Sequence, residues 1–405
     1  MKAPRNFQPH PFAYHQEIEL CIEDLTNLGQ GVGRIDGWVV FVPFALPGER
    51  VRTRIWRNKK NYSDADLVEV LDPSPDRRIP QCPLFRECGG CQYQHYAYPA
   101  QLEWKSRQIA SLLGKMAGLQ HVVNPCLGRP DKTFSYRSKI TPHFRRPPHL
   151  PGTAIGFQRF ANRSIIDVEE CPIASESINK ALPLERRRLQ GEKGRHRRGG
   201  TLLLRDSQEG VLTDMKAVAT ESVNEYYFRF VAGEFFQNNP HVLPLMVNYA
   251  LDRAAGREID FLVDAYCGVG VFGICGHQRF KEVSGIEVSD RAVELARDNA
   301  ADNRAGNVKI HLGKAEAIFE QIDYPPARTC VLLDPPRKGC DADFIRQLLN
   351  FEPRRIVYVS CGPDTQARDV ALLIENHYEV SDIQPVDLFP QTRHIENIIT
   401  LEQKD

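Results

Sequence analysis

The C-terminal half of the chain contains a run of apolar and β-branched residues, RIVYVS, that stops at Cys361, Gly362 and Pro363. Such a run closed by turn formers predicts a buried parallel strand that delivers its last side chain to a loop. Open α/β sheets place their reactive groups in loops of this kind. Cys361 is therefore either a nucleophilic thiol or a small buried hydrophobe, and its position alone does not distinguish the two.

A second group of cysteines lies in QCPLFRECGGCQYQH, where Cys82, Cys88 and Cys91 follow the spacing C-x5-C-x2-C around two glycines. Cys171, which also precedes a proline, is the best candidate for a fourth ligand, and His95 is its main rival. Four thiolates hold either zinc or an iron–sulfur cluster. Three clustered cysteines with a distant fourth favour a 4Fe-4S cluster; zinc, or a chance grouping of cysteines, is the alternative.

A glycine-rich turn follows the apolar run FLVDAY. Gly268, Gly270 and Gly273 match G-x-G-x-x-G, and Glu287 ends the next apolar run about 20 residues later, as a nucleotide ribose requires. A dinucleotide and S-adenosylmethionine both fit this pattern. A later run ends in Asp334, Pro335 and Pro336, which resembles the signature of S-adenosylmethionine-dependent methyltransferases that act on bases. No feature of the sequence indicates a nicotinamide.

The elements that must position these residues alternate between strand and helix from residue 231 to 405. Five apolar runs predict strands, and three amphipathic segments predict helices between or after them; the runs are FLVDAYCGVGVFGI, VSGIEVS, NVKIHLG, TCVLLDPP and RIVYVSC, and the segments are DRAVELARDNAADN, DADFIRQLLNF and DTQARDVALLIENH. NIITLEQ predicts a further terminal strand. This alternation predicts an α/β domain with a doubly wound, mainly parallel sheet.

Residues 13–74 instead read as short alternating strands punctuated by glycines, the pattern of a small β-barrel of the oligonucleotide-binding type. Its expected tip interleaves cations with Trp56 and Tyr62; the cations are Arg50, Arg52, Arg54, Arg57, Lys59 and Lys60. Cations beside aromatic rings suit phosphates and unstacked bases. A solvated strand face is the alternative interpretation.

Residues 75–230 form the expected central, mainly β domain, which carries the cysteine site and an amphipathic helix near residues 98–117. Its strands place arginines between aromatic residues. The basic segment ERRRLQGEKGRHRRGG predicts a surface loop that either contacts RNA phosphates or is a mobile hairpin tip.

The formal net charge of the 405 residues is zero, but it is unevenly distributed. Residues 1–232 carry 34 Lys and Arg against 25 Asp and Glu, a net +9, so the remaining residues carry 18 against 27, a net −9. This asymmetry predicts a polyanion partner for the first half and a small ligand for the second. No apolar run is long enough to span a bilayer, and the N-terminal residues MKAPRNFQPHPF have no apolar core like that of a signal peptide. We therefore expect a cytoplasmic protein without a membrane partner and with reduced cysteines; no feature indicates an obligate protein partner.

Taken together, DPPRKG, SCGPDT and RHIEN resemble motifs of the RNA 5-methyluridine methyltransferase family. The earlier segments FFQNNP, DAYCGVG and GIEVS occur in the same order as in that family. The resemblance implies a TRAM barrel, a 4Fe-4S centre and a Rossmann-like class I methyltransferase domain. A TRAM barrel together with a cluster looks most like the bacterial enzyme for large-subunit (23S) ribosomal RNA. The chain departs from the family at Gly362, where Asn is usual after the nucleophile, and at Val271, which replaces a frequent Asn.

By this resemblance, Cys361 is the nucleophile that adds to carbon 6 of uracil, because carbon 5 is a poor nucleophile until a thiolate pushes electron density onto it. Carbon 5 then takes the methyl group of S-adenosylmethionine, and Glu396, with His394 beside it, removes the proton at carbon 5. Asp334 would orient the uracil between cofactor and base. The target base must first be flipped out of its stack.

The family implies that the cofactor lies against residues from three segments; they are Gln237, Tyr266, Gly268, Gly270 and Glu287, with Asp334 beside them. The cluster is expected to be structural, since methyl transfer requires no electron. The alternatives are the same reaction on tRNA, an iron–sulfur RNA-binding protein with a degenerate catalytic domain, and an oxidoreductase. The joint presence of Cys361, Glu396, Asp334 and the glycine-rich turn argues against the non-enzyme alternative, and an oxidoreductase leaves DPPRKG and RHIEN unexplained.

Overall fold

A computed structural model describes residues 3–192 and 198–404, and the central residues of the basic segment ERRRLQGEKGRHRRGG lie outside the described residues. The chain divides into two compact units, the first comprising residues 1–101, 157–166 and 391–393 and the second comprising residues 102–156, 167–390 and 394–405. No helix among the described residues is long and apolar enough to cross a membrane.

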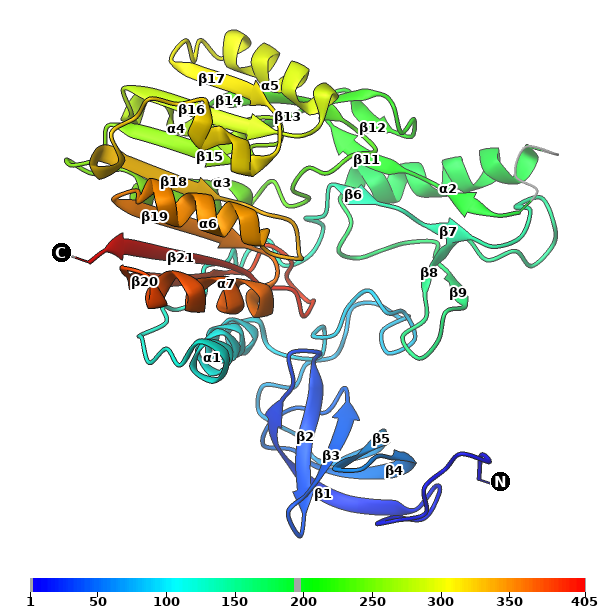
Figure 1. Ribbon diagram of the computed structural model, residues 1–405. Coiled ribbons are helices and arrows are strands. Elements are labelled where there is room, and N and C mark those ends of the chain that lie inside the picture. The colour runs from blue at the N-terminus through cyan, green and yellow to red at the C-terminus, as the bar shows by residue number, and fades with distance from the viewer. Residues whose placement is uncertain (1–2, 193–197, 405) are drawn as a thin grey trace. The chain divides into compact units, whose positions relative to one another are not determined.

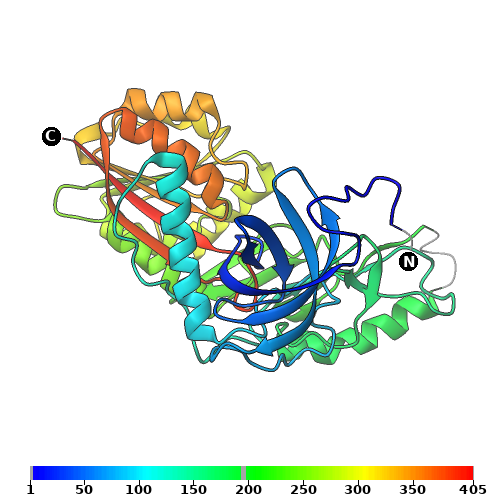
Figure 2. The same ribbon diagram turned by 90° about the horizontal axis from the view of Figure 1, so that it is seen from below.

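The first unit contains a closed five-stranded barrel, which Figure 2 shows as a ring of blue strands. In the order β1-β2-β3-β5-β4 its strands are β1 (Glu17–Leu25), β2 (Gln30–Ile35), β3 (Trp38–Pro43), β5 (Tyr62–Asp72) and β4 (Arg50–Asn58). Alternate side chains such as Leu20, Val40 and Ile55 fill the interior. Gly33 is required there because a Cβ would lie 1.9 Å from the Leu20 side chain. The barrel expected from the alternating pattern is confirmed.

The second unit is built on a seven-stranded sheet with the order β17-β16-β15-β18-β19-β21-β20 (Figure 1). Its strands are β15 (Phe261–Ala265), β16 (Glu282–Glu287), β17 (Val308–Leu312), β18 (Thr329–Leu333), β19 (Arg355–Ser360), β20 (Tyr378–Val386) and β21 (Glu396–Gln403). The first five are parallel, and β21 runs antiparallel to both β19 and β20. The predicted doubly wound sheet is confirmed; β20 was not foreseen.

Helices cover both faces of this sheet, as the period of two along each strand requires. On β18, Cys330 and Leu332 join the core formed with α3 (Leu243–Ala254), α4 (Val271–Gly276) and α5 (Asp290–Asp302). Val331 and Leu333 join the opposite core, formed with α6 (Ala342–Phe351), α7 (Pro363–Glu375) and part of α1 (Tyr98–Ala117). The α1 helix spans the residues over which the sequence predicts a helix, and Figure 2 shows it in cyan beside the red C-terminal strands.

Besides α1 and α3, the residues that link β5 to β15 in the sequence form short strands and the helix α2. They are β6 (Lys139–Ile140), β7 (His143–Phe144), β8 (Gly156–Gln158), β9 (Ile165–Asp167), α2 (Glu176–Gly191), β10 (Gly200–Thr201), β11 (Leu204–Ser207), β12 (Gly210–Leu212), β13 (Val218–Val223) and β14 (Tyr226–Val231). The β13–β14 hairpin packs through Phe228 and Phe230 into the core that contains α3, and so leads directly into the sheet domain.

Candidate active site

The register of the sheet aligns the predicted site residues at one edge. Ala265 pairs with Ile286 and with Leu333, so Tyr266, Glu287 and Asp334 leave neighbouring strands at the same level. Ser360 pairs with Asn397 on the antiparallel strand β21, so Cys361 and Glu396 are the next residues along this pair. Because neighbouring strands lie about 4.8 Å apart, the fold brings thiol and carboxyl group side by side from positions far apart in the sequence.

Cys361 lies half-buried at the start of α7, and three charged groups set its pKa. Burial and the carboxyl groups of Glu396 and Asp334 raise the pKa of the thiol to about 11, while the Arg337 guanidinium opposes the rise. The thiolate, not the thiol, is the nucleophile. The reactivity of Cys361 therefore depends on how many charges the two carboxyl groups carry.

The loop that follows Cys361 is held against the DPPR loop. Thr365 donates its hydroxyl hydrogen to the Arg337 carbonyl oxygen (3.0 Å) and to the Gly362 carbonyl oxygen (2.9 Å). A Cβ at residue 362 would lie 2.8 Å from Thr365 Oγ1 and 2.9 Å from the Arg337 carbonyl oxygen. A side chain here requires one of the two loops to move, which explains in this chain the glycine at a position where the related family usually has Asn.

The carboxyl groups of the site favour the protonated form. Glu396 is 2% exposed, and burial and Asp334 raise its pKa well above the usual range, against the charges of Arg337 and Lys105. Burial raises the pKa of Asp334 to about 7. The pKa of Asp264, on β15 beneath the glycine turn, is likewise raised to about 7 by burial, with Asp334 and Glu287 contributing. Carboxyl groups with a pKa of about 7, as in Asp334 and Asp264, exchange protons at physiological pH.

The segment before Glu396 is tied to other elements. His394 Nδ1 lies 3.4 Å from an Arg337 guanidinium nitrogen. The Lys105 ammonium donates to the His394 carbonyl oxygen (2.8 Å) and to Asp387 Oδ1 (2.6 Å). The sequence analysis did not identify Arg337, Lys105 or Asp387 as residues near the site. The one available signal was Lys105, a lysine on the buried side of a predicted helix.

The glycine turn after β15 has the strained backbone of a ligand-binding loop. Tyr266, Gly268 and Gly270 all have positive φ, 64°, 54° and 88° respectively. The Gly268 amide donates to Glu287 Oε2 (3.2 Å), so the turn and the carboxylate at the end of β16 face each other. Glu287 Oε1 accepts from the amides of Val288 and Ser289, each at 2.8 Å, which fixes its orientation.

Two further features of the turn support this geometry. The Tyr266 ring packs on Phe344 of α6, with 5.4 Å between ring centroids. The Gly273 amide donates to Asp264 Oδ2 (2.8 Å), which anchors α4 to the strand before it. Val271 opens α4 at the position where the related family often has Asn.

Gln237 lies half-buried in the loop between β14 and α3. The next two residues fix this loop: Asn238 accepts from the Arg205 guanidinium (2.9 Å), and buried Asn239 donates to the Leu388 carbonyl oxygen (2.9 Å). Gln237 is thus held on an anchored loop of the second unit, and its contact with a cofactor stays a prediction.

The structure gives the least support to the predicted cysteine site. Cys82, Cys88 and Cys91 lie in the first compact unit and Cys171 in the second, and among the described residues no group of three or more His, Cys, Asp or Glu side chains is placed to hold a metal. Burial raises the pKa of the Cys88 thiol, and nearby Cys82 adds to the rise. His95 is buried, and its pKa falls to about 3 because of burial and the charges of Arg77 and Arg86. The 4Fe-4S centre stays a prediction.

On the barrel, several of the expected RNA-binding arginines are engaged in ion pairs. Arg50 contacts Glu19 (2.9 Å) and Asp72 (2.7 Å), Arg52 contacts Glu69 (2.9 Å), and Arg57 contacts Asp64 (2.7 Å). Arg57 also lies over the ring of Trp56, 4.6 Å from its centroid.

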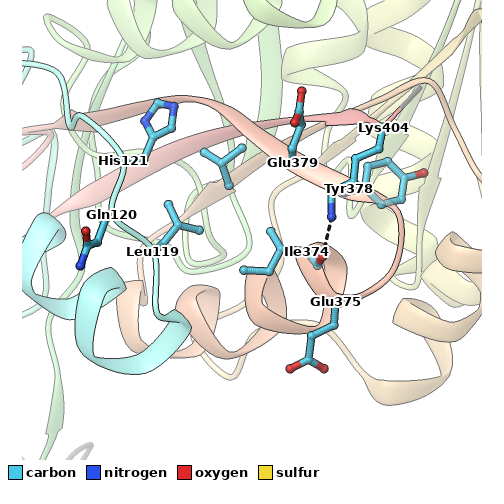
Figure 3. Close-up of a pocket in the computed structure, with 9 residues that line it drawn as sticks. Leu119, Gln120, His121, Ile374, Glu375, Tyr378, Glu379 and Lys404 are labelled. Carbon is cyan, nitrogen blue, oxygen red and sulfur yellow. Dashed lines mark hydrogen bonds between the residues drawn. The ribbon is translucent and has the colours of Figure 1, made fainter.

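A cavity of about 390 Å³ lies elsewhere in the second unit (Figure 3). Leu119, Ile374, Tyr378 and Lys404 are among its lining residues, and Lys404 Nζ donates to the Ile374 carbonyl oxygen (3.1 Å). It opens at the C-terminal end of α7, whereas Cys361 precedes the N-terminal end. A helix of 13 residues is about 20 Å long, so this cavity is separate from the site at the strand ends.

Comparison with known proteins identifies the family to which the chain is similar. Residues 206–404 match the family model described as tRNA (uracil-5-)-methyltransferase, and residues 15–68 match the TRAM domain. A tRNA (uracil(54)-C(5))-methyltransferase of Schizosaccharomyces pombe is 40% identical over 96% of this chain and 79% of its own length. The Saccharomyces cerevisiae protein of the same name is 32% identical over 98% and 75%. An uncharacterized RNA methyltransferase of Halalkalibacterium halodurans is 32% identical over 98% and 99%.

Among solved structures, a Pyrococcus abyssi tRNA (uracil-54, C5)-methyltransferase in complex with S-adenosyl-L-homocysteine superposes with a TM-score of 0.69. The match is 22% identical and covers 95% of this chain and all of the other. At this identity the likeness concerns the fold.

Proposed function

The chain belongs to the tRNA (uracil-5-)-methyltransferase family, and we propose that its substrate is a tRNA in which it methylates carbon 5 of one uridine through Cys361 and Glu396. It is an S-adenosylmethionine-dependent RNA uracil-C5 methyltransferase. The observation that carries the assignment of residues is the pairing of β19 with β21, because Cys361 and Glu396 directly follow the pair Ser360 and Asn397 at the edge of the sheet.

The choice of tRNA rests on the relatives. Both yeast relatives bear the name of tRNA uracil-54 methyltransferases, and both match nearly all of this chain. The sequence led us to expect 23S ribosomal RNA, because the combination of a TRAM barrel and a cluster resembles the rRNA enzyme. That expectation receives no support from the comparisons, which favour the tRNA alternative.

In the proposed reaction the Cys361 thiolate forms a bond to carbon 6 of the flipped uracil, and the electron pair of the carbon 5–carbon 6 double bond moves toward carbon 4 and its oxygen. S-adenosylmethionine supplies an electrophilic methyl group, which carbon 5 takes. Glu396 then accepts the proton from carbon 5, and the electrons of that bond expel the thiolate from carbon 6. The thiolate is restored at the end of each cycle, and Glu396 releases its proton to solvent.

The charges of the site support these roles. Because burial and Asp334 raise the pKa of Glu396, its carboxylate is a strong base once it has lost its proton. Arg337 lowers the pKa of both Glu396 and Cys361, and it therefore favours the charged forms that act in the reaction. Asp334, with a pKa of about 7, is available both as a hydrogen-bond donor to a uracil carbonyl and as an acceptor from the N3–H group.

For the methyl donor, we propose the turn after β15 and the carboxylate that faces it. The amides near Gly268 and Gly270 allow close approach, Tyr266 offers an aromatic face, and Glu287 is oriented to accept from ribose hydroxyl groups. Gln237 would reach the cofactor from its anchored loop.

We propose that the barrel and the central region, residues 13–230, bind the RNA backbone, because the net positive charge lies in this part of the chain. The exposed pair of Trp56 and Arg57 suits a base stacked on an aromatic ring beside a phosphate.

The expected 4Fe-4S cluster has no step in this reaction. Among the described residues no group of three or more His, Cys, Asp or Glu side chains is placed to hold a metal, so the ligand set Cys82, Cys88, Cys91 and Cys171 stays a prediction. Iron and sulfide analysis of protein purified without oxygen decides between the cluster and no cluster: four irons per chain, lost in Cys88→Ser, would support it, and zinc or no metal would refute it.

The substrate proposal is tested with methyl-labelled S-adenosylmethionine and separate transcripts of tRNA and 23S ribosomal RNA. We expect label at carbon 5 of one uridine in tRNA, and none in a tRNA in which that uridine is changed to cytidine. Label confined to the ribosomal RNA would contradict the choice of tRNA and restore the alternative.

A further inference from the structure

A fully buried ion pair lies behind the proposed base. Lys105 of α1 donates from Nζ to Asp387 Oδ1 at 2.6 Å, and both side chains are 0% exposed. The same ammonium donates to the main-chain carbonyl oxygen of His394 at 2.8 Å. One buried cation thus joins α1, the end of β20 and the segment that leads into β21.

Such a pair is unusual as a purely structural device. Removing two charges from water costs several kcal/mol per ion, and apolar side chains of similar volume often stabilise a core at least as well. Asp387 is anchored in its own right, since its amide donates to the Leu127 carbonyl oxygen (2.7 Å) beside the bridge between Leu127 and Val386. Asp387 Oδ2 has no hydrogen-bond partner among the described residues, so Lys105 carries much of the compensation for this carboxylate.

The position of the pair relates it to Glu396. His394, whose carbonyl oxygen receives the Lys105 hydrogen bond, lies two residues before Glu396 at the start of β21. The imidazole ring of His394 contacts the Arg337 guanidinium through Nδ1. The segment from His394 to Glu396 is therefore held from both sides by cations.

We infer that Lys105 is a positioning residue for Glu396: its ammonium, held by Asp387, fixes the main chain at His394 and sets a buried positive charge beside the carboxyl group of the base. The inference rests on the role proposed for Glu396. Lys105 is 0% exposed and acts through the main chain and through its charge, so it need not touch the uracil.

The charge has a predictable effect on the base. Four charged or titratable groups act on Glu396: Asp334 and burial raise its pKa, Arg337 and Lys105 lower it, and the Cys361 thiol shares the site. Without the positive charge of Lys105, the pKa of Glu396 rises further, and a larger fraction of the enzyme holds the base in its inactive, protonated form. The acid limb of the pH profile must then move to higher pH.

The test uses the double variant Lys105→Met/Asp387→Asn, because Lys105→Met alone leaves a buried unpaired carboxylate and threatens folding. Its matched control is Asp382→Asn, which alters a different polar link to β20, the one that joins Asp382 to Asn124 (2.8 Å) and Tyr249 (2.6 Å) and does not reach His394. We expect kcat of the double variant to fall about a hundredfold, KM for RNA to change little, and the acid limb to move to higher pH. A kcat and a pH profile equal to those of Asp382→Asn would overturn the inference.

A second measurement does not depend on the reaction. Amide hydrogen exchange of residues 394–397 in the free protein reports whether Lys105 holds this segment. We expect faster exchange there in the double variant and wild-type exchange in Asp382→Asn. Unchanged exchange would refute the positioning role even if the wild-type protein methylates tRNA, whereas absence of methylation by the wild-type protein would refute the proposed function and leave the exchange result standing.

Discussion

The thiol of Cys361 faces two carboxyl groups and one guanidinium, and the balance among them decides when it reacts. With a pKa of about 11, most of the thiol is protonated at neutral pH in the free protein. A protonated Asp334 or Glu396 removes a negative charge from its surroundings and makes the thiolate easier to form. The proposed nucleophile Cys361 and the proposed base Glu396 are therefore coupled, because each is charged most easily when the other is neutral.

The raised pKa of Asp334 has a consequence for stability. The unfolded chain releases this proton near pH 4, whereas the folded protein keeps it up to about pH 7. Between these values the folded state holds more protons, so the contribution of Asp334 to the free energy of unfolding falls as the pH rises.

We therefore predict that Asp334→Asn changes the pH dependence of stability. Relative to wild type, the variant should gain up to about 4 kcal/mol between pH 4 and pH 8, measured as the free energy of unfolding in urea. Asp341→Asn, which removes a carboxylate that is 66% exposed, is the control. Parallel curves for wild type and Asp334→Asn would contradict the raised pKa of Asp334.

Strand register and two short loops assemble the site. Parallel strands β15, β16, β18 and β19 deliver Tyr266, Glu287, Asp334 and Cys361 to one edge, and antiparallel β21 brings Glu396 there from the opposite chain direction. The loop after β18 and the start of α7 are packed so closely that Gly362 has no room for a side chain.

Gly362→Ala is expected to force these two loops apart. We predict a loss of about 1–3 kcal/mol in the free energy of unfolding, as for other overpacked sites, together with a lower kcat. Gly306 is the matched control, because a Cβ there meets no atom within 4 Å and its φ is not positive. Equal effects of Gly362→Ala and Gly306→Ala in urea unfolding would show that the contact with the Arg337 carbonyl oxygen is not tight.

The sequence predicts some of these features for clear physical reasons. Apolar runs that end in Glu287, Asp334 and Cys361 identify parallel strands and hence a common edge. Glu396 was assigned by family resemblance alone, since an antiparallel strand carries no signal of which neighbour it joins. Lys105 and Asp387 are 282 positions apart, and a contact of this kind depends on how α1 packs on the sheet, which periodicity does not reveal.

Charge is divided along the chain in the way that an RNA enzyme with a small-molecule site requires. The net charge of +9 lies in residues 1–232 and that of −9 in the residues that hold the site. Many of the barrel arginines are already paired with carboxylates, so the net charge overstates how many are available to phosphates.

We predict that Trp56→Ala weakens RNA binding about five- to a hundredfold, the loss expected for one stacked base, while the affinity for S-adenosylmethionine stays the same. Val68→Ala is the control, because Val68 is an exposed apolar residue of the same barrel. Filter binding at fixed salt concentration measures the affinity of each variant for RNA and for S-adenosylmethionine. If the two variants bind RNA equally well, the barrel face around Trp56 does not hold the substrate.

The central claim is that Cys361 bonds to the uracil and Glu396 releases it. The most direct measurement incubates Glu396→Gln with labelled tRNA and S-adenosylmethionine and then separates protein from RNA under denaturing conditions. A covalent complex should accumulate while turnover falls about 10²- to 10⁴-fold, and it should be absent in Cys361→Ala and in the double variant Cys361→Ala/Glu396→Gln. Turnover at the wild-type rate in Glu396→Gln, or a complex that still forms without Cys361, would contradict the account.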